Sequence, residues 1–380
     1  MDARIVYRNA NVITDGAVSG LRDVVCEDGR ILELCPAGFG RGGRTQDLKG
    51  AYLAPGFIDL HCHGAGGYEF LDGTEEAVRG AAAVHAANGT RVLYPTLSAS
   101  SFDTVWKALE VLEAARDGCA LLIPGVHLEG PYLSPEMSGA QEPGCITAPI
   151  EADYTRLWDR FGSLIARWTY APERDGNGRF LAFLREHGII PSIGHSAAEY
   201  DCVLRAYEGG CRLVTHLYSC TSTVIRRGGF RKLGIIESAW LLDGLYVEAI
   251  TDGCHLPPEL LRMILKIKGS DHVALITDAI RYAGTESSGP VAGSATLSYL
   301  IEDGVAKLAD RSAFAGSIAT TGRILRVACG IGIPLGDTVK MLTRVPAEIM
   351  GLPSLGRIAP GYDAVFTAFD QDLNILPDVR

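Results

Sequence analysis

The stretch GFIDLHCH, residues 56–63, is a short apolar run that ends in two histidines. Seven more β-rich apolar runs follow it, and most lead into a helix-like segment such as TEEAVRGAAAVHAANG at 74–89. Strands that alternate with helices predict an α/β fold, and the count of eight favours a closed (β/α)8 barrel of the TIM type over an open doubly wound sheet. The further runs are RVLYPTLS, LLIPGVHLEG, ARWTYAPE, IIPSIGHS, RLVTHLYS, LYVEAITDGCH and VALITDAI.

The two chain ends have a different pattern from the barrel segment. Residues 1–51 contain short strand-like runs separated by turns, and the tail GRIAPGYDAVFTAFD, residues 356–370, returns to a strand pattern. We therefore expect one small β-sandwich domain built from residues 1–51 and 355–380. The barrel domain is expected to span residues 52–354.

Charge and cysteine content limit the kinds of partner and compartment. The formal net charge of −10 disfavours nucleic acid or an anionic membrane as the main partner, although a local arginine can still bind a small anionic substrate. The ten cysteines form no CxxC pair, which is typical of reduced thiols rather than of a disulfide framework. No signal-peptide pattern is evident, and no stretch reaches the roughly 18 apolar residues of a membrane span. We therefore predict a cytoplasmic protein.

Polar residues recur at the carboxyl ends of the predicted strands. In a (β/α)8 barrel these strand ends line the active site. One buried histidine alone is more often a satisfied core residue, but a whole set of buried polar groups needs partners, because burying an unpaired charge is costly. The set at the matching strand ends comprises His61, His63, Glu129, His195, His216, His255 and Asp278.

These residue types suit a divalent metal. Residues two apart in a strand point to the same face, so His61 and His63 can reach one ion. Glu129 can ligate one metal or bridge two. With His195 and His216 it makes a His/Glu/His set that is suited to zinc or ferrous iron with an open position for water.

Asp278 stands at the end of the eighth predicted strand. An aspartate in this place can accept a proton from water and later return it to a leaving group. A helix N-cap is the alternative role for this residue. A metal that activates water and polarises a carbonyl, together with this carboxylate, indicates hydrolysis at an amide or amidine carbon.

Six further motifs are more specific than single residues: HLEGPYLSPEMSGAQ, GHSAA, THLYS, DGCHLPP, LITDAI and FAGS. With them, the chain resembles the amidohydrolase superfamily and, within it, the N-acetylglucosamine-6-phosphate deacetylase family, from APGFIDLHCHG to GRIAPGYDA. Other branches usually carry a carboxylated lysine on a middle strand, whereas Glu129 takes that place here. The resemblance implies hydrolysis of the acetamide of a phosphorylated amino sugar, N-acetylglucosamine 6-phosphate, to glucosamine 6-phosphate and acetate.

The resemblance also implies a role for each matching residue. Asp278 is the general base and acid, and His255 contacts the substrate and helps to orient or polarise the acetyl carbonyl. The implied cofactor is one or two divalent ions, Zn²⁺ in the first place and Fe²⁺ as an alternative. The implied ligands are Glu129, His195 and His216 for the principal metal, and His61 and His63 for a second. The implied substrate contacts are Gln141, Ser219, the backbone N–H of Cys220, Arg227 and His255.

The loop after the sixth predicted strand departs from the family pattern. The family commonly reads THLFNAM or THLYNAM and then an arginine before Pro-Gly, whereas this chain reads THLYSCTSTVIRRGGFRKLG. Ser219 replaces the asparagine, and Arg227 falls at the spacing of the phosphate-binding arginine. With Arg226, Arg231 and Lys232 nearby, the run is either a solvated face or an anion clamp, and a guanidinium suits phosphate. The resemblance further implies a homodimer with this loop near the partner.

Two other functions stay open at this point. The altered loop allows an amidohydrolase that acts on a different N-acyl amino sugar or on a cyclic amide. A catalytically silent barrel with a binding role is the other alternative, although silent relatives usually lose metal ligands and this chain keeps them. A panel of N-acyl substrates would separate these functions.

Overall fold

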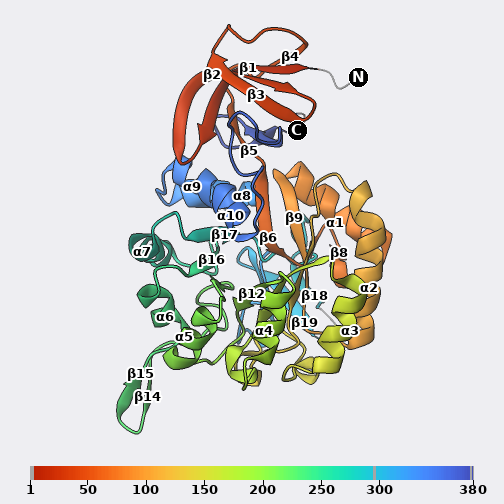
Figure 1. Ribbon diagram of the computed structural model, residues 1–380, viewed down its shortest axis with the longest axis vertical. Coiled ribbons are helices and arrows are strands. Elements are labelled where there is room, and N and C mark those ends of the chain that lie inside the picture. Colours follow the sequence, from red (N-terminus) through yellow and green to blue (C-terminus); the bar gives the residue numbers. More distant parts are fainter. Residues whose placement is uncertain (1–3, 294–296, 377–378, 380) are drawn as a thin grey trace.

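The computed structural model describes residues 4–293, 297–376 and 379 (Figure 1). A small β-sheet lies at one end of the molecule, and a barrel with its surrounding helices forms the larger part. The outermost residues of the expected small domain, 1–3, 377–378 and 380, lie outside the described part of the chain.

Eight parallel strands form the barrel, and each overlaps one of the eight predicted apolar runs. In sheet order from the first, they are β6 (Phe57–Cys62), β9 (Thr90–Leu97), β10 (Val126–Glu129), β11 (Ile165–Tyr170), β12 (Ile190–Ile193), β13 (Leu213–Val214), β16 (Tyr246–Ile250) and β17 (Val273–Ile276). The sheet closes because the Asp278 N–H donates to the His61 carbonyl at 2.9 Å and Cys62 pairs in parallel with Ala279. The predicted (β/α)8 class is therefore confirmed.

The helices pack apolar faces against the outside of this barrel (Figure 1). The first of them begins at Thr74, whose hydroxyl accepts a hydrogen bond from the Ala77 N–H and caps the helix. The helices are α1 (Glu75–Ala87), α2 (Phe102–Ala115), α3 (Glu151–Phe161), α4 (Arg179–Glu186), α5 (Tyr200–Glu208), α6 (Ile235–Leu241), α7 (Pro258–Lys268), α8 (Thr321–Gly330), α9 (Leu335–Leu342) and α10 (Arg344–Ile349). Short 3₁₀ helices lie in connections at Phe70–Asp72, Arg116–Gly118, Pro135–Met137, Pro143–Cys145 and Pro172–Arg174.

Strands from both chain ends share one mixed sheet, as expected for the small β domain. Its strands are β1 (Ile5–Thr14), β2 (Ala17–Glu27), β3 (Arg30–Pro36), β4 (Arg44–Asp47), β5 (Tyr52–Pro55), β21 (Phe366–Phe369) and β22 (Ile375–Leu376). The two ends meet where β21 pairs antiparallel with β5, and Thr367 lies opposite Ala54. The sheet has its own apolar core, which includes Val24, Leu53 and Phe366. The division of the chain at residues 51/52 and 354/355 stays a prediction.

Three smaller groups of strands interrupt the alternating pattern. Antiparallel strands β18 (Gly289–Ala292), β19 (Ser298–Glu302) and β20 (Val305–Leu308) follow the last barrel strand. The short pair β7 (Gly64–Ala65) and β8 (Tyr68–Glu69) follows the first barrel strand. The hairpin of β14 (Ile225–Arg227) and β15 (Phe230–Lys232) follows β13 and extends away from the barrel (Figure 1).

The helices are short compared with a lipid bilayer. Within the described ranges, none of them combines the length and the apolar composition that a membrane crossing requires.

Candidate active site and metal centre

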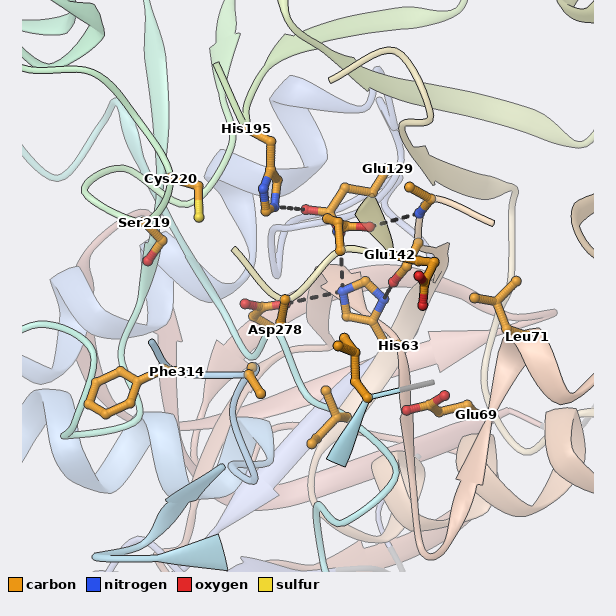
Figure 2. A pocket seen from close by; sticks show the side chains of 18 of the residues that line it. His63, Glu69, Leu71, Glu129, Glu142, His195, Ser219, Cys220, Asp278 and Phe314 are labelled. Carbon is orange, nitrogen blue, oxygen red and sulfur yellow. Dashed lines mark hydrogen bonds and ion pairs between the residues drawn. The ribbon is translucent and has the colours of Figure 1, made fainter. Parts of the chain in front are cut away.

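A cavity of about 510 Å³ lies where the carboxyl ends of the barrel strands meet. Figure 2 shows His63, Asp278, Glu129 and His195 facing one another in it, with Ser219 and Cys220 on the side of His195. The predicted residues that line the cavity are His63, Glu129, Gln141, His195, His216, Ser219, Cys220, His255 and Asp278. The structure thus brings together side chains that are up to 215 positions apart in the sequence, from His63 to Asp278.

Glu129 is the hub of the polar cluster. Its Oε1 lies 2.9 Å from His216 Nε2, 3.2 Å from His195 Nε2 and 3.4 Å from His61 Nε2. Its Oε2 lies 3.4 Å from His63 Nε2. All four predicted histidine ligands therefore direct the same ring nitrogen towards one buried carboxylate.

The other nitrogen of each ring has a separate partner that explains this orientation. His195 Nδ1 lies 2.9 Å from the Met137 carbonyl, and His216 Nδ1 lies 3.1 Å from the Ser219 carbonyl. A carbonyl only accepts hydrogen bonds, so Nδ1 carries the proton in both rings and Nε2 presents its lone pair. The hydroxyl of Ser98 lies 2.9 Å from Nδ1 of His63 and fixes the orientation of that ring, but a hydroxyl can donate or accept, so this contact does not select the tautomer.

Asp278 completes a second group of facing atoms. Its Oδ1 lies 3.2 Å from His63 Nε2 and 3.4 Å from His61 Nε2, and these two nitrogens are only 3.2 Å apart. Nitrogen lone pairs and carboxylate oxygens at such distances repel one another unless a cation or a proton lies between them. The residues therefore fit a divalent metal, with the sets His61/His63/Asp278 and His61/Glu129/His216 each close enough to share one ion.

The backbone conformation at these strand ends is unusual. His195, His216 and Asp278 have φ angles of +47°, +27° and +49°, in a region that non-glycine residues rarely adopt. Such conformations cost free energy and cluster at functional sites. Here the left-handed turn comes directly after each strand, where the side chain enters the cavity.

Electrostatic interactions within the cluster keep both carboxylates ionised. Burial raises the pKa of Asp278, but interactions with the neighbouring His61 and His63 outweigh this effect and lower the pKa to about 2. Burial also raises the pKa of Glu129, yet His61, His195 and His216 hold it well below its usual range. Two carboxylates that are charged at neutral pH favour a cation in the cavity.

His255 belongs to the same cavity but not to the cation cluster. Its Nδ1 lies 2.8 Å from Asp252 Oδ2, and Asp252 Oδ1 accepts hydrogen bonds from the backbone N–H groups of Cys254 and His255. The Phe314 ring packs against the imidazole with centroids 4.8 Å apart. This arrangement leaves His255 Nε2 for a contact with a bound molecule.

Two predicted substrate contacts have partners within the protein. The Gln141 side chain donates from Nε2 to Glu129 Oε2 at 2.7 Å and accepts at Oε1 from the Ala99 N–H at 2.8 Å. Arg227 lies on β14, its side chain is 68% exposed, and it forms an ion pair of 2.8 Å with Glu199. Gln141 therefore orients the Glu129 carboxylate. Arg227 is not among the described residues that line the cavity.

The sequence patterns did not single out several residues that hold the cluster in place. Ser98 orients His63, Asp252 orients His255, and Glu248 lies against His61. The spacing of three residues in TDGCH was a possible signal for Asp252, and the strand-end position was one for Ser98. Glu248 has no such signal, because it lies inside β16 between apolar residues.

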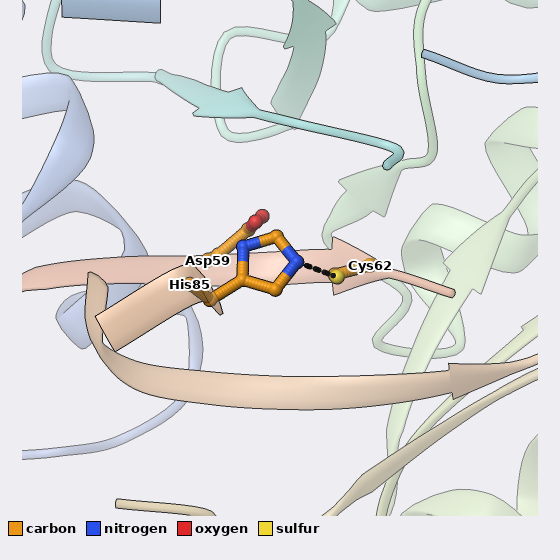
Figure 3. A group of neighbouring side chains, drawn as sticks. All are labelled: Asp59, Cys62 and His85. Atoms are coloured by element: carbon orange, nitrogen blue, oxygen red, sulfur yellow. Dashed lines mark hydrogen bonds between the residues drawn. The ribbon is translucent and has the colours of Figure 1, made fainter. Parts of the chain in front are cut away.

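A third group of potential ligands, Asp59, Cys62 and His85, lies fully buried between β6 and α1 (Figure 3). Asp59 already accepts a hydrogen bond of 2.6 Å from the Thr277 hydroxyl. Burial raises the pKa of the Cys62 thiol well above its usual value. His85 lies 2.9 Å from this thiol and 3.1 Å from the Gly64 carbonyl. The group therefore ties the first barrel strand to its neighbours.

Comparisons with known proteins agree with this geometry. The model of the amidohydrolase family matches residues 52–380. An N-acetylglucosamine-6-phosphate deacetylase of Lysinibacillus sphaericus is 30% identical over 97% of this chain and 94% of its own length. An N-acetylgalactosamine-6-phosphate deacetylase of Shewanella sp. is 28% identical over 99% and 94%.

Solved structures extend the likeness to three dimensions. The N-acetylglucosamine-6-phosphate deacetylase of Pasteurella multocida has a TM-score of 0.90 and 29% identity, and the match covers 98% of this chain and 97% of that one. The enzyme of Mycobacterium smegmatis, solved as a variant in complex with N-acetyl-D-glucosamine-6-phosphate, has a TM-score of 0.89, 29% identity and the same coverage. The chain belongs to the amidohydrolase family, in the group of the N-acetylglucosamine-6-phosphate deacetylases.

Proposed function

We propose that this protein is a metal-dependent deacetylase that hydrolyses the acetamide of N-acetylglucosamine 6-phosphate to glucosamine 6-phosphate and acetate. The observation that carries the proposal is the convergence of four imidazole Nε2 atoms on Glu129, beside Asp278, in a cavity large enough for a sugar phosphate. The full-length likeness to deacetylases of phosphorylated amino sugars supports the same reaction.

The principal metal would be held by Glu129, His195 and His216, and a second by His61 and His63 with Asp278. Zinc suits this set of imidazole and carboxylate ligands, and ferrous iron is the alternative. When bound, such an ion lowers the pKa of water towards about 7 and polarises a carbonyl oxygen.

Asp278 would move the proton of the reaction. Its carboxylate is ionised at neutral pH because His61 and His63 lower its pKa to about 2 against the effect of burial. It would accept a proton from the attacking water and then return it to the nitrogen of the departing amino sugar. This sequence balances, since one proton of water passes to the nitrogen, which leaves as the neutral amine, and the hydroxyl stays on the acyl carbon as acetic acid, which then ionises to acetate.

His255 would bind the acetyl carbonyl. With Nδ1 held by Asp252 at 2.8 Å, the ring keeps Nε2 directed into the cavity, where an Nε2–H would donate to the carbonyl oxygen. A donor fixed in advance at the carbonyl oxygen stabilises the negative charge that develops there. Phe314 limits the rotation of the ring from the other side.

The phosphate would bind on the side of Ser219 and Cys220. Arg281 is the one arginine or lysine among the described residues that line the cavity, and its guanidinium already pairs with Glu69 at 3.0 Å and Asp72 at 2.8 Å. An additional cation is therefore needed on the phosphate side, and we assign Arg227 to this role from a partner subunit in a homodimer.

Exposed apolar side chains on the hairpin support this assignment. Phe230 is 76% exposed on β15, and Ile225 is 43% exposed on β14, beside the exposed cations of the same strands. Exposed apolar groups of this size fit a contact between subunits. The surface ion pair of Arg227 with Glu199 holds the side chain weakly, because solvent screens such pairs. A cytoplasmic location, which fits the free cysteines, completes the proposal.

The first experiment measures acetate release by zinc-reconstituted protein from N-acetylglucosamine 6-phosphate and from N-acetylglucosamine. Strong preference for the phosphorylated sugar is the expected result. Equal rates would keep the chemistry and remove the phosphate site, whereas no release from either sugar would overturn the proposal. N-acetylgalactosamine 6-phosphate belongs in the same panel, because a relative with 28% identity over 99% of this chain is named for that substrate.

A further inference from the structure

A buried ion pair crosses the barrel interior below the candidate metal centre. Arg167 on β11 and Glu248 on β16 are both fully buried, and Arg167 Nη1 donates a short hydrogen bond to Glu248 Oε1. Barrel interiors are usually filled with branched apolar side chains. A buried ion pair often contributes no more net stability than apolar residues of the same volume, so this pair calls for another explanation.

Each of the three guanidinium nitrogens has a hydrogen-bond partner. Nε donates to Ser192 Oγ at 3.0 Å, Nη2 donates to Thr215 Oγ1 at 2.9 Å, and Nη1 also donates to the Leu60 carbonyl at 3.2 Å. These partners come from three other barrel strands or their ends. The guanidinium is therefore fixed, and it fixes Glu248 in turn.

The second oxygen of Glu248 faces the metal centre. Its Oε2 lies 3.4 Å from His61 Nδ1 and accepts a hydrogen bond of 3.2 Å from the His216 backbone N–H. An ionised carboxylate only accepts hydrogen bonds, so it selects the form of His61 that carries a proton on Nδ1. The lone pair of His61 Nε2 is then directed towards Asp278, His63 and Glu129, at 3.4, 3.2 and 3.4 Å.

We infer that Glu248, held by Arg167, is a positioning residue that determines how tightly a second divalent cation binds at His61, His63 and Asp278. The inference rests on the proposed metal centre and deepens it. Neither Glu248 nor Arg167 lines the cavity or joins the ligand sets. Their effect passes through one imidazole, in the manner of the carboxylate partners that orient metal-bound histidines.

The variant Glu248→Gln distinguishes this role from simple filling of space. A carboxamide has one oxygen, and the Arg167 guanidinium attracts it more strongly than a neutral ring does. The amide NH₂ then faces His61 Nδ1, which moves the ring proton to Nε2 and removes the lone pair from the cation site. The double variant Arg167→Met/Glu248→Gln removes the guanidinium that competes with His61 for the carboxamide oxygen. This oxygen can then turn back to His61 Nδ1–H.

The test measures zinc per chain by elemental analysis after zinc-loaded protein is dialysed against a series of buffered chelator concentrations. The unmodified protein should release two ions in two steps. Glu248→Gln should weaken the binding of the more loosely held ion by about 10- to 100-fold, and that of the tightly held ion by less, because Glu248 also accepts from the His216 N–H. The double variant should recover at least part of that loss. Asp252→Asn, which removes a carboxylate from His255 instead, is the matched control and should leave both steps unchanged.

Three results would overturn the inference. The first is release of a single ion by the unmodified protein. The second is that Glu248→Gln releases its two ions at the same chelator concentrations as the unmodified protein. The third is equal weakening of the binding of both ions, together with a lower melting temperature, in Glu248→Gln and in the double variant. Failure of the proposed function is seen separately, as absence of acetate release from any of the phosphorylated sugars by protein that binds two ions.

Discussion

Replacing Asp278 by Asn tests the centre of the proposed reaction with the smallest change of shape. Asparagine has the same number of heavy atoms, but its amide cannot take up a proton near neutral pH. The side-chain oxygen Oδ1 lies beside His63 Nε2 at 3.2 Å and His61 Nε2 at 3.4 Å. The set Glu129/His195/His216 is held together by contacts that do not involve Asp278. The principal metal should therefore stay bound.

The size of the effect follows from the two proton transfers assigned to this carboxylate. A positioned general acid or base typically contributes about 10²- to 10⁴-fold. We expect kcat to fall about 10³-fold, which corresponds to about 4 kcal/mol in the activation barrier. The KM should stay within about threefold, because Asp278 acts in the transition state rather than in binding the sugar and phosphate.

The assay is acetate release from N-acetylglucosamine 6-phosphate over a range of concentrations, with zinc per chain measured on the same preparation. Asp23→Asn is the matched control, since it also replaces a buried aspartate by its amide, but in the small sheet away from the cavity, and it should leave kcat unchanged. A kcat of Asp278→Asn within tenfold of the unmodified protein, with at least one zinc per chain retained, would refute the role of Asp278 as the proton carrier.

Three further changes have distinct expected outcomes. Glu129→Gln should lower zinc content and kcat together, because it neutralises the hub that lies within 3.4 Å of four imidazoles; full zinc content would contradict this. Arg227→Ala should raise the KM for the phosphorylated sugar about tenfold and leave the unphosphorylated sugar unaffected; equal effects on both sugars would remove the phosphate contact. Trp168→Ala should lower the free energy of unfolding, measured by urea denaturation, by about 3–5 kcal/mol. The buried ring stacks on Tyr132, and its Nε1–H donates to the Gly130 carbonyl. Trp168→Phe should lower the free energy of unfolding by less.

Much of the architecture could be predicted from local sequence patterns. Each barrel strand lies in a mostly apolar run and is buried along nearly its whole length, and helix-like segments with one apolar face separate most of the strands. Such patterns are local, so they can be recognised in the sequence without knowledge of the fold. The polar residues at the ends of the runs, such as Glu129 and His216, could be placed at one end of the barrel because all parallel strands end on the same side.

Contacts between segments that are far apart in the sequence could not be predicted in this way. Gln141 was expected at the sugar, and the structure places its amide between Glu129 and the Ala99 N–H. Arg227 was expected at the phosphate, and the structure places it on an exposed hairpin, where it pairs with Glu199. Both roles stay predictions for the assays above.

The amino-acid sequence by itself determined the class of fold, the family, and the side chains that could hold a metal. It could not determine the tautomer of each histidine, because that depends on what lies against the second ring nitrogen. For His61 the partner is Glu248, 187 positions away and held by Arg167 from yet another strand. Hydrogen bonds act only over short distances, and only closure of the barrel brings His61 and Arg167 each against Glu248.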